Sequence, residues 1–316
     1  MIPLFRTLCL ALALVAVGPW AWAQELRPGV ELIGADLSGR SLEGATLQGA
    51  NLSGANLSGA SLKNADLREA YFRNANLSGA DLTGANLGGA DLSLARLDGA
   101  RLGGVMLARA RLVRASLEDA VLEGAFLGGA DLTRANLSGA DLSRVVLQGA
   151  RLDQAVLSEA NLRDAVLGAR GAGQDGPSPA SLRGANLTGA VADGADFNSV
   201  NLREARLEGA SFKGANLADG DLSWSEAAGA DFSGAEMTLA RLRAADLSDT
   251  NFTGATLDLA RAAGANFEGA DLTDASLVGA DVTLADLAGA KLGGADLEGL
   301  LSGGASGLPA KGGVGE

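Results

Sequence analysis

The sequence predicts an all-β solenoid, in which the chain winds into stacked coils and each side of a coil is one five-residue repeat. A large apolar residue recurs at every fifth position from Leu32 to Leu297, and 47 of these 54 positions are Leu or Phe. The residue two places earlier is Ala at 44 of the 53 positions from Ala35 to Ala295. Gly often stands two places after the large residue, where a corner of the chain tolerates Gly because it reaches a positive φ angle without steric cost.

The five-residue period excludes the two common regular structures. In an α-helix the large residues would advance by about 140° per repeat and would form no stripe. In a flat strand an odd period would point successive large residues to opposite faces. A short extended segment that points both Ala and Leu inward, followed by a corner, buries all of them. Each buried Leu then contributes roughly 1.5–3 kcal/mol of transfer free energy.

The individual repeats resemble those of a known family. Residues 55–59 read Ala-Asn-Leu-Ser-Gly and residues 80–84 read Ala-Asp-Leu-Thr-Gly. They resemble the pentapeptide-repeat family, whose consensus is Ala-(Asp/Asn)-Leu-x-x, and the resemblance covers nearly all of the chain after residue 30. It implies a right-handed quadrilateral β-helix with four pentapeptides per coil, and therefore about 13 coils. With that number of sides, Phe212, Phe232 and Phe252 should stack in the core of successive coils.

The N-terminus is typical of an export signal. Arg6 precedes the apolar run of residues 8–17, and Ala21-Trp22-Ala23 forms a small-x-small cleavage site. We expect residues 1–23 to be removed and the product to be periplasmic or secreted, with no membrane span. An uncleaved membrane anchor is the alternative, but the apolar run is too short to span a bilayer comfortably. The single cysteine, Cys9, would leave with the signal.

The rest of the chain divides at changes in the repeat. Residues 24–30 form a lead-in, residues 31–167 the first part of the array and residues 180–300 the second part. Residues 168–179 contain ten more residues than an ordinary corner, together with the array's prolines. We expect an extruded loop there; half a coil of degenerate sides is the alternative, because ten residues are two repeats in frame. Residues 301–316 are Gly-rich, and we expect a disordered tail.

The composition argues against an enzyme, a cofactor or a metal site. The chain has no His, and its single Cys lies in the signal, so most catalytic bases, nucleophiles and transition-metal ligands are missing. Carboxylates are frequent, but residues such as Asp81 and Asp131 occupy the outward position before Leu, where the repeat accounts for them. The nonapeptide repeat that binds Ca²⁺ in other β-solenoids is absent from the sequence.

The charge of the chain is acidic and uneven. The net charge is −13, and residues 180–316 hold 20 acidic against 9 basic side chains, while residues 24–179 hold 18 against 15. The resemblance suggests an inhibitor that mimics DNA, because an acidic field steers a basic partner and repels nucleic acid itself. We therefore expect no direct nucleic-acid binding. The export signal argues against the mimic, since gyrase-type targets are cytoplasmic, and acidity also serves solubility.

One outward column departs from the repeat. With four sides per coil, the residues before four successive leucines stack on one face, where Asp or Asn is usual; they are Met106, Phe126, Val146 and Val166. Their neighbours are small, and arginines in nearby coils form a basic rim: Arg101, Arg109, Arg111, Arg134 and Arg151. An apolar strip with a charged rim is typical of a docking surface. The alternative is that outward positions simply tolerate β-branched residues, which favour strands.

These observations predict a non-enzymatic interaction surface or structural spacer in the bacterial envelope. An unknown protein partner, or a second copy of the chain, would dock on the outward column from residue 106 to residue 166, with Arg109 and Arg111 beside it. The alternative function is an acidic mimic of a polyanion that inhibits a DNA-binding enzyme.

Overall fold

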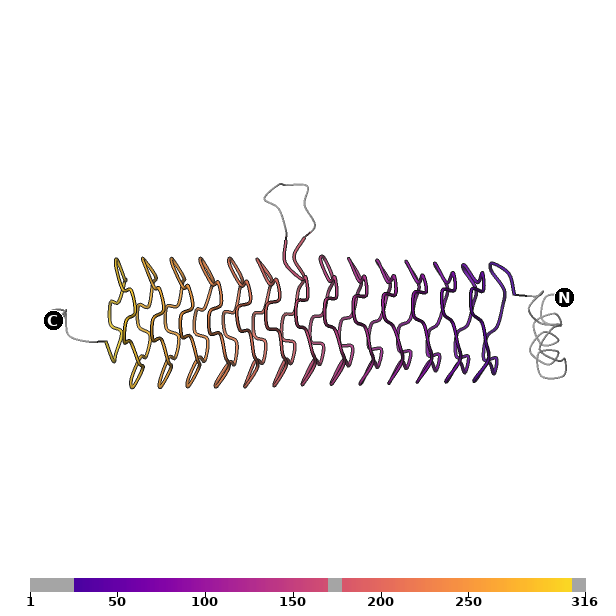
Figure 1. Cartoon of the computed structure of the whole chain (residues 1–316), viewed down its shortest axis with the longest axis horizontal. Helices are drawn as coiled ribbons and strands as arrows, with labels where there is room; N and C mark the ends of the chain where they lie inside the picture. The colour runs from indigo at the N-terminus through magenta and orange to yellow at the C-terminus, as the bar shows by residue number, and fades with distance from the viewer. Residues whose placement is uncertain (1–25, 170–177, 309–316) are drawn as a thin grey trace. The chain divides into compact units, whose positions relative to one another are not determined.

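The computed structural model describes residues 26–169 and 178–308. In these ranges the backbone forms no helix, and every β contact is an isolated parallel bridge centred on one residue. Except where they pass over residues 168–179, the bridges join residues 20 apart, as from Glu31 to Asn51 and from Asn51 to Tyr71. Because 20 residues are four pentapeptides, each coil has four sides. Successive coils follow one another along each unit (Figure 1). The predicted signal (1–23), most of the predicted loop (170–177) and the last tail residues (309–316) lie outside the described residues.

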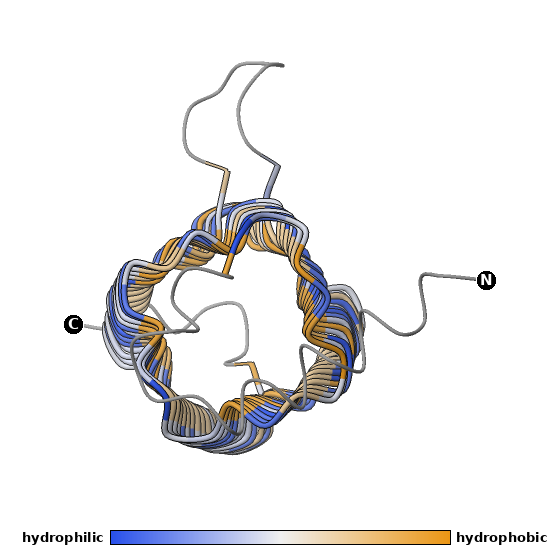
Figure 2. Ribbon diagram, turned by 90° about the vertical axis from the view of Figure 1, so that its right-hand side faces the viewer, coloured by the Kyte–Doolittle hydropathy of each residue, from blue (hydrophilic) through white to orange (hydrophobic). Residues whose placement is uncertain are grey.

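The chain divides into two compact units, Met1–Val156 and Leu157–Glu316. In the first unit the bridges run from Glu31 to Val156, and in the second from Asn161 to Ser306. Within each unit the coils lie in register, so that an end-on view superimposes the corners of successive coils (Figure 2).

Leu and Ala fill the inside of each coil, as the period predicts. Leu57 and Ala60, for example, are both fully buried, and the same is true of nearly every repeat. The Phe prediction is confirmed: the ring of Phe232 lies 5.3 Å from that of Phe212 and 5.2 Å from that of Phe252, and both pairs are stacked. Within each unit the core is therefore a column of stacked inward side chains, and outside the last coil mainly outward and corner residues face solvent.

The hydrogen bonds of one repeat explain why Asp or Asn precedes Leu. The N–H groups of Asn56, Leu57 and Gly59 each donate to a backbone carbonyl of a neighbouring coil at 2.6–3.0 Å, and the Ala60 N–H closes the corner onto the Leu57 carbonyl at 3.0 Å. The fifth donor, the Ser58 N–H, has no backbone acceptor and donates instead to the side-chain oxygen of Asn56 at 3.2 Å. The outward Asp or Asn is thus a cap that satisfies the last backbone donor.

Every ordinary corner places its last residue in the left-handed region. Gly59 has a φ of 64°, which is the conformation that the third residue of a type II turn requires and that Gly adopts freely. Non-glycine residues hold the same angle at other corners, including bulky ones such as Leu259 at 56° and Trp224 at 60°. The fold dictates the corner angle and overrides the preference of the residue that stands there.

The ladder passes over the ten extra residues of the 168–179 segment. Asn161 bridges Val191, 30 residues away, whereas half a coil of extra sides would pair it with Ser181. The Ala180 N–H donates to the Leu167 carbonyl at 2.9 Å, which is the bond that closes an ordinary corner. The register is therefore that of an insertion within one corner.

Both ends of the array reach further than the predicted boundaries. The Gly29 N–H donates to the Gln48 carbonyl at 2.8 Å, so the lead-in joins the ladder before residue 31. At the other end Ser306 bridges Asp286, so the tail predicted from residue 301 begins too early. Ser302 replaces the large central residue there, but backbone hydrogen bonds to the preceding coil hold the last side in place.

Candidate functional site

Three residues of the predicted apolar column lie side by side in the first unit. Met106 bridges Phe126, and Phe126 bridges Val146. Met106 is 42% and Phe126 52% exposed, and Val146 is half-buried. Val166, the fourth predicted member, belongs to the second unit, where it bridges Asp196. We call Met106, Phe126 and Val146 the exposed column.

The exposed column lacks the caps that the repeat normally provides. On the same side of the preceding coil, the Asn86 side-chain oxygen accepts a hydrogen bond from the Gly88 N–H at 3.1 Å. Met106 and Phe126 offer no acceptor, and in the described part of the chain the N–H groups of Ala108 and Gly128 make no hydrogen bond. A typical hydrogen bond contributes about 0.5–1.5 kcal/mol. At these positions the sequence therefore gives up a stabilising cap in return for an apolar side chain on the surface.

Two arginines predicted beside this column are available to a partner. Arg109 stands at the corner after Met106, is exposed, and extends over Gly129 of the next coil. Arg111 is outward and exposed on the adjoining side, between Asp91 and Asp131. Neither arginine forms an ion pair among the described residues.

Arg111 also acts on a neighbouring carboxyl. Burial raises the pKa of Asp91, but the neighbouring Ser93, whose backbone N–H donates to the carboxylate at 3.0 Å, and the charges of Arg111 and Arg73 lower that pKa overall. The carboxylate of Asp91 is therefore a structural cap, which accepts the Ser93 backbone N–H, and it does not act as a proton donor.

The remaining rim arginines are engaged with their own surroundings. The guanidinium of Arg101 lies 3.7 Å from the Asp81 carboxylate, and that of Arg151 lies 3.7 Å from the Asp153 carboxylate. The Arg134 Nε donates a hydrogen bond to the side-chain oxygen of Gln154 at 2.8 Å. Of the predicted rim arginines, Arg109 and Arg111 are therefore the two whose charge is available beside the exposed column.

Sequence reasoning missed two exposed features. Val121 is 41% exposed on the side that precedes Phe126 in the same coil, so the apolar surface continues around a corner. In the second unit, Trp224 is 42% exposed between Arg203 and Arg243. The sequence could have indicated this residue, because Trp224 is the only tryptophan after the predicted export signal, which contains Trp20 and Trp22.

The outward aspartates are mostly caps with lowered pKa values. The strongest case is Asp271, where hydrogen bonds from the Thr273 side chain, from Lys291 and from the Thr273 backbone lower the pKa from 3.8 to about 2. The side chain and backbone of Thr283 likewise lower the pKa of Asp281. Such carboxylates stay ionised at neutral pH and do not suit general acid catalysis, which needs a pKa near the working pH.

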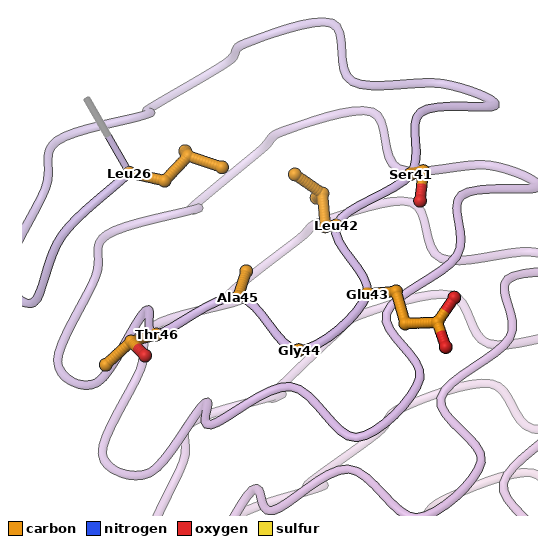
Figure 3. A pocket seen from close by; sticks show the side chains of 7 residues that line it. All are labelled: Leu26, Ser41, Leu42, Glu43, Gly44, Ala45 and Thr46. Atoms are coloured by element: carbon orange, nitrogen blue, oxygen red, sulfur yellow. The ribbon is translucent and has the colours of Figure 1, made fainter. Parts of the chain in front are cut away.

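The described residues offer little for small-molecule or metal chemistry. A shallow hollow of about 320 Å³ lies beside Leu26 and residues 41–46, and its only ionisable side chain is that of Glu43 (Figure 3). No group of three His, Cys, Asp or Glu side chains in the described ranges is arranged to hold a metal ion. The same ranges contain no helix with the length and apolar character needed to cross a membrane.

Comparison with known proteins finds one family. The profile described as pentapeptide repeats matches in eight copies, over residues 31–68, 65–104, 75–112, 110–149, 140–168, 180–219, 221–258 and 265–299. A comparison with curated proteins finds no match.

Several solved structures are similar to the chain. HetL of the cyanobacterium Nostoc, a pentapeptide-repeat protein involved in the regulation of heterocyst differentiation, is 26% identical, with 87% of this chain and 90% of that chain covered and a TM-score of 0.25. A pentapeptide-repeat protein of the Arabidopsis thaliana thylakoid lumen is 32% identical over 42% of this chain and 77% of that chain, with a TM-score of 0.21. Full-length QnrB1, a plasmid-mediated fluoroquinolone resistance protein, is 20% identical over 83% and 91%, with a TM-score of 0.20.

Proposed function

Because the chain belongs to the pentapeptide-repeat family, we propose that it is an interaction solenoid of the bacterial envelope, which binds a protein partner through an outer face. Its fold is a right-handed quadrilateral β-helix, and it is a repeat protein of a non-enzymatic kind. In this fold nearly every coil buries its inward residues, which are mostly Leu and Ala. The differences between coils that a partner can reach therefore reside in outward and corner side chains, and any specific recognition must use them.

The exposed column is the observation that supports a protein partner most directly. Phe126 and Met106 present apolar surface to solvent, and the free N–H groups of Ala108 and Gly128 lie beside it. A partner that packs an apolar side chain there and places carbonyl oxygens over the free donors would satisfy both features. A small-molecule ligand would need a concave site, and the column is outward.

The two free arginines add a preference in charge. Arg109 and Arg111 border the exposed column, so a partner with carboxylates at the edge of its apolar patch is favoured over one with a basic edge. A second copy of the chain is also acidic overall, and self-association through this surface is therefore an outcome that the experiment must distinguish.

Residues 1–23 support the envelope as the place of action. A positively charged start, an apolar run and a small-x-small site precede Gln24. Mass spectrometry of the protein purified from its own cells should find Gln24 as the first residue, and fractionation should find the chain outside the cytoplasm. An intact N-terminus on a cytosolic protein would contradict the proposed location.

Site-specific photocrosslinking in the native cell tests the proposed surface. A photoreactive residue replaces Phe126 in one variant and Asn136, an outward residue on another side of the same unit, in the control. We expect one protein adduct from position 126 and none from position 136. Adducts of two copies of the chain would assign the surface to self-association, while equal adducts from both positions would contradict a specific surface.

An acidic mimic of a polyanion is the second candidate function. The excess of 20 acidic over 9 basic side chains in residues 180–316 is the observation that favours it. Salt-sensitive binding of the chain to a DNA-binding enzyme, lost when that half is neutralised, would support the mimic over the envelope function.

A further inference from the structure

Trp224 is the one aromatic residue among the exposed large apolar side chains in the described part of the second unit. It stands at a corner, 42% exposed, with a φ of 60°. A bulky residue in the left-handed region is uncommon, and Gly is the residue that most corners of this chain use. The indole lies outside the core of the coil, which other residues fill.

Two arginines hold the indole from the coils on either side. The guanidinium carbon of Arg203, in the preceding coil, lies 4.3 Å from the ring centroid, and that of Arg243, in the following coil, lies 5.9 Å away. Cation–π contacts of this kind fix the position of a guanidinium while its N–H groups remain free for hydrogen bonds. Trp224 therefore orders two cationic groups at the surface.

Two further arginines extend the same surface. Arg241 and Arg261 are both exposed and outward, and a backbone β-bridge joins them in successive coils. Arg241, Arg243 and Arg261 form no ion pair among the described residues, although acidic side chains outnumber basic ones in this half of the chain. We call Arg203, Trp224, Arg241, Arg243 and Arg261 the arginine–tryptophan strip.

Two carboxylates stand in line with the strip, because Asp221 bridges Arg241 and Asp281 bridges Arg261. Asp221 lies 3.7 Å from Arg203, and Glu204 pairs with Arg183 at 2.9 Å. The four arginines of the strip outnumber Asp221 and Asp281, so the strip keeps a net positive charge. A local cationic surface in an acidic half is the reverse of what general solubility would require, so it indicates recognition of an anion.

We propose that the arginine–tryptophan strip binds a short acidic segment of another protein, with its Asp or Glu carboxylates on the guanidinium groups. Guanidinium and carboxylate match in a bidentate geometry, and Trp and Arg are the residue types that dominate binding energy at protein interfaces. Successive coils lie about 4.8 Å apart, so the strip presents its cations in a line along an extended peptide.

The acidity of the surroundings favours a peptide over a polyanion. Nucleic acids and other long polyanions carry charge along their whole length, and they would be repelled by the acidic sides that flank the strip. A short peptide with a few carboxylates is long enough to cover the arginines without lying along those acidic sides. This surface lies in the second unit, and the proposal does not depend on the exposed column of the first unit.

Fluorescence titration of the full chain tests the proposal. Replacement of Trp20 and Trp22 by Phe leaves Trp224 as the only indole. The probes are a glutamate-rich peptide, the same peptide with Gln in place of Glu, and a single-stranded oligonucleotide of equal charge. We expect the glutamate peptide to shift the emission of Trp224, and the other two probes to leave it unchanged. Equal binding of the oligonucleotide, or no response to the glutamate peptide, would overturn the proposal.

Substitutions then locate the site. Arg243→Gln and Arg261→Gln should each weaken binding of the glutamate peptide by about tenfold or more, as loss of a charge-assisted hydrogen bond implies. Arg206→Gln is the matched control, because Arg206 lies on another side and pairs with Glu208 and Glu226. Labelled peptide and anisotropy extend the test to Trp224→Gly, whose corner angle suits Gly. This variant should fold but bind more weakly; unchanged affinity in all three strip variants would overturn the proposal.

Discussion

Phe126→Asn separates what the exposed column does for stability from what it does for binding. Phe126 is 52% exposed, so about half of its side chain is buried, and losing that burial costs roughly 0.7–1.5 kcal/mol. Asn restores the cap that other repeats have, because its side-chain oxygen accepts from the Gly128 N–H, and this contributes about 0.5–1.5 kcal/mol. The two terms nearly cancel, and the free energy of unfolding should change by less than about 1 kcal/mol.

Urea unfolding followed by far-ultraviolet circular dichroism measures this change, with midpoints compared at equal slope. The control is Phe232→Ala, in which a fully buried ring with stacked neighbours at 5.3 and 5.2 Å is removed. A loss above about 2 kcal/mol for Phe126→Asn would refute the cap argument, since Phe126 would then be needed for the fold itself.

The other predictions concern the core, the corners and the caps. Phe232→Ala should destabilise by about 3–5 kcal/mol, read as a lower urea midpoint, because a packed column of rings cannot close the cavity; a change near zero would contradict the ladder. Ala130→Leu should destabilise by about 1–3 kcal/mol or more in the same assay, because Ala130 is fully buried where the sides converge; an unchanged midpoint would mean that the interior has room. The lowered pKa of Asp271 stabilises the fold above pH 3.8, and this contribution is lost as pH falls toward about 2. The melting temperature of the wild type should therefore fall more steeply over this range than that of Asp271→Asn, and parallel curves would show that the carboxylate does not contribute.

Most of the fold could be predicted from the five-residue period of the sequence. Leu at one position and Ala two residues earlier have only one arrangement that buries both, and the buried state of residues such as Leu57 and Ala60 follows from it. The number of sides came from the family resemblance, and the bridges 20 residues apart show it. The role of Asn56 as a cap was not visible in the pattern, because it depends on which backbone donor the coil leaves without a carbonyl.

The boundaries were harder to predict than the repeat. Ser306 remains in the ladder although the large central residue is lost at Ser302, because backbone bonds between coils do not depend on the side chain. The sequence left two alternatives for residues 168–179, since ten extra residues keep the frame either way. The pairing of Asn161 with Val191 distinguishes a register with an insertion from one with extra sides, and the pairing of Val166 with Asp196 agrees with it.

The candidate surface was partly visible in the sequence. Stacking every twentieth residue placed Met106 beside Phe126, and the structure brings these two together. The free state of Arg109 was not predictable, because ion pairs depend on side-chain directions that a repeat frame does not specify. Trp224 and its two arginines come from three different coils, so their contact appears only when the coil length is applied to corner residues as well.

The most direct test of the proposed function compares the dissociation constant of the partner for the wild type with that for a folded variant of the exposed column. The partner captured from position 126 is titrated with the wild type and with the Met106→Asn/Phe126→Asn variant, whose caps are restored. We expect the variant to unfold at nearly the same urea concentration and to bind at least about tenfold more weakly. Equal affinity would show that the partner uses another part of the chain and that these outward apolar residues have no role in its recognition.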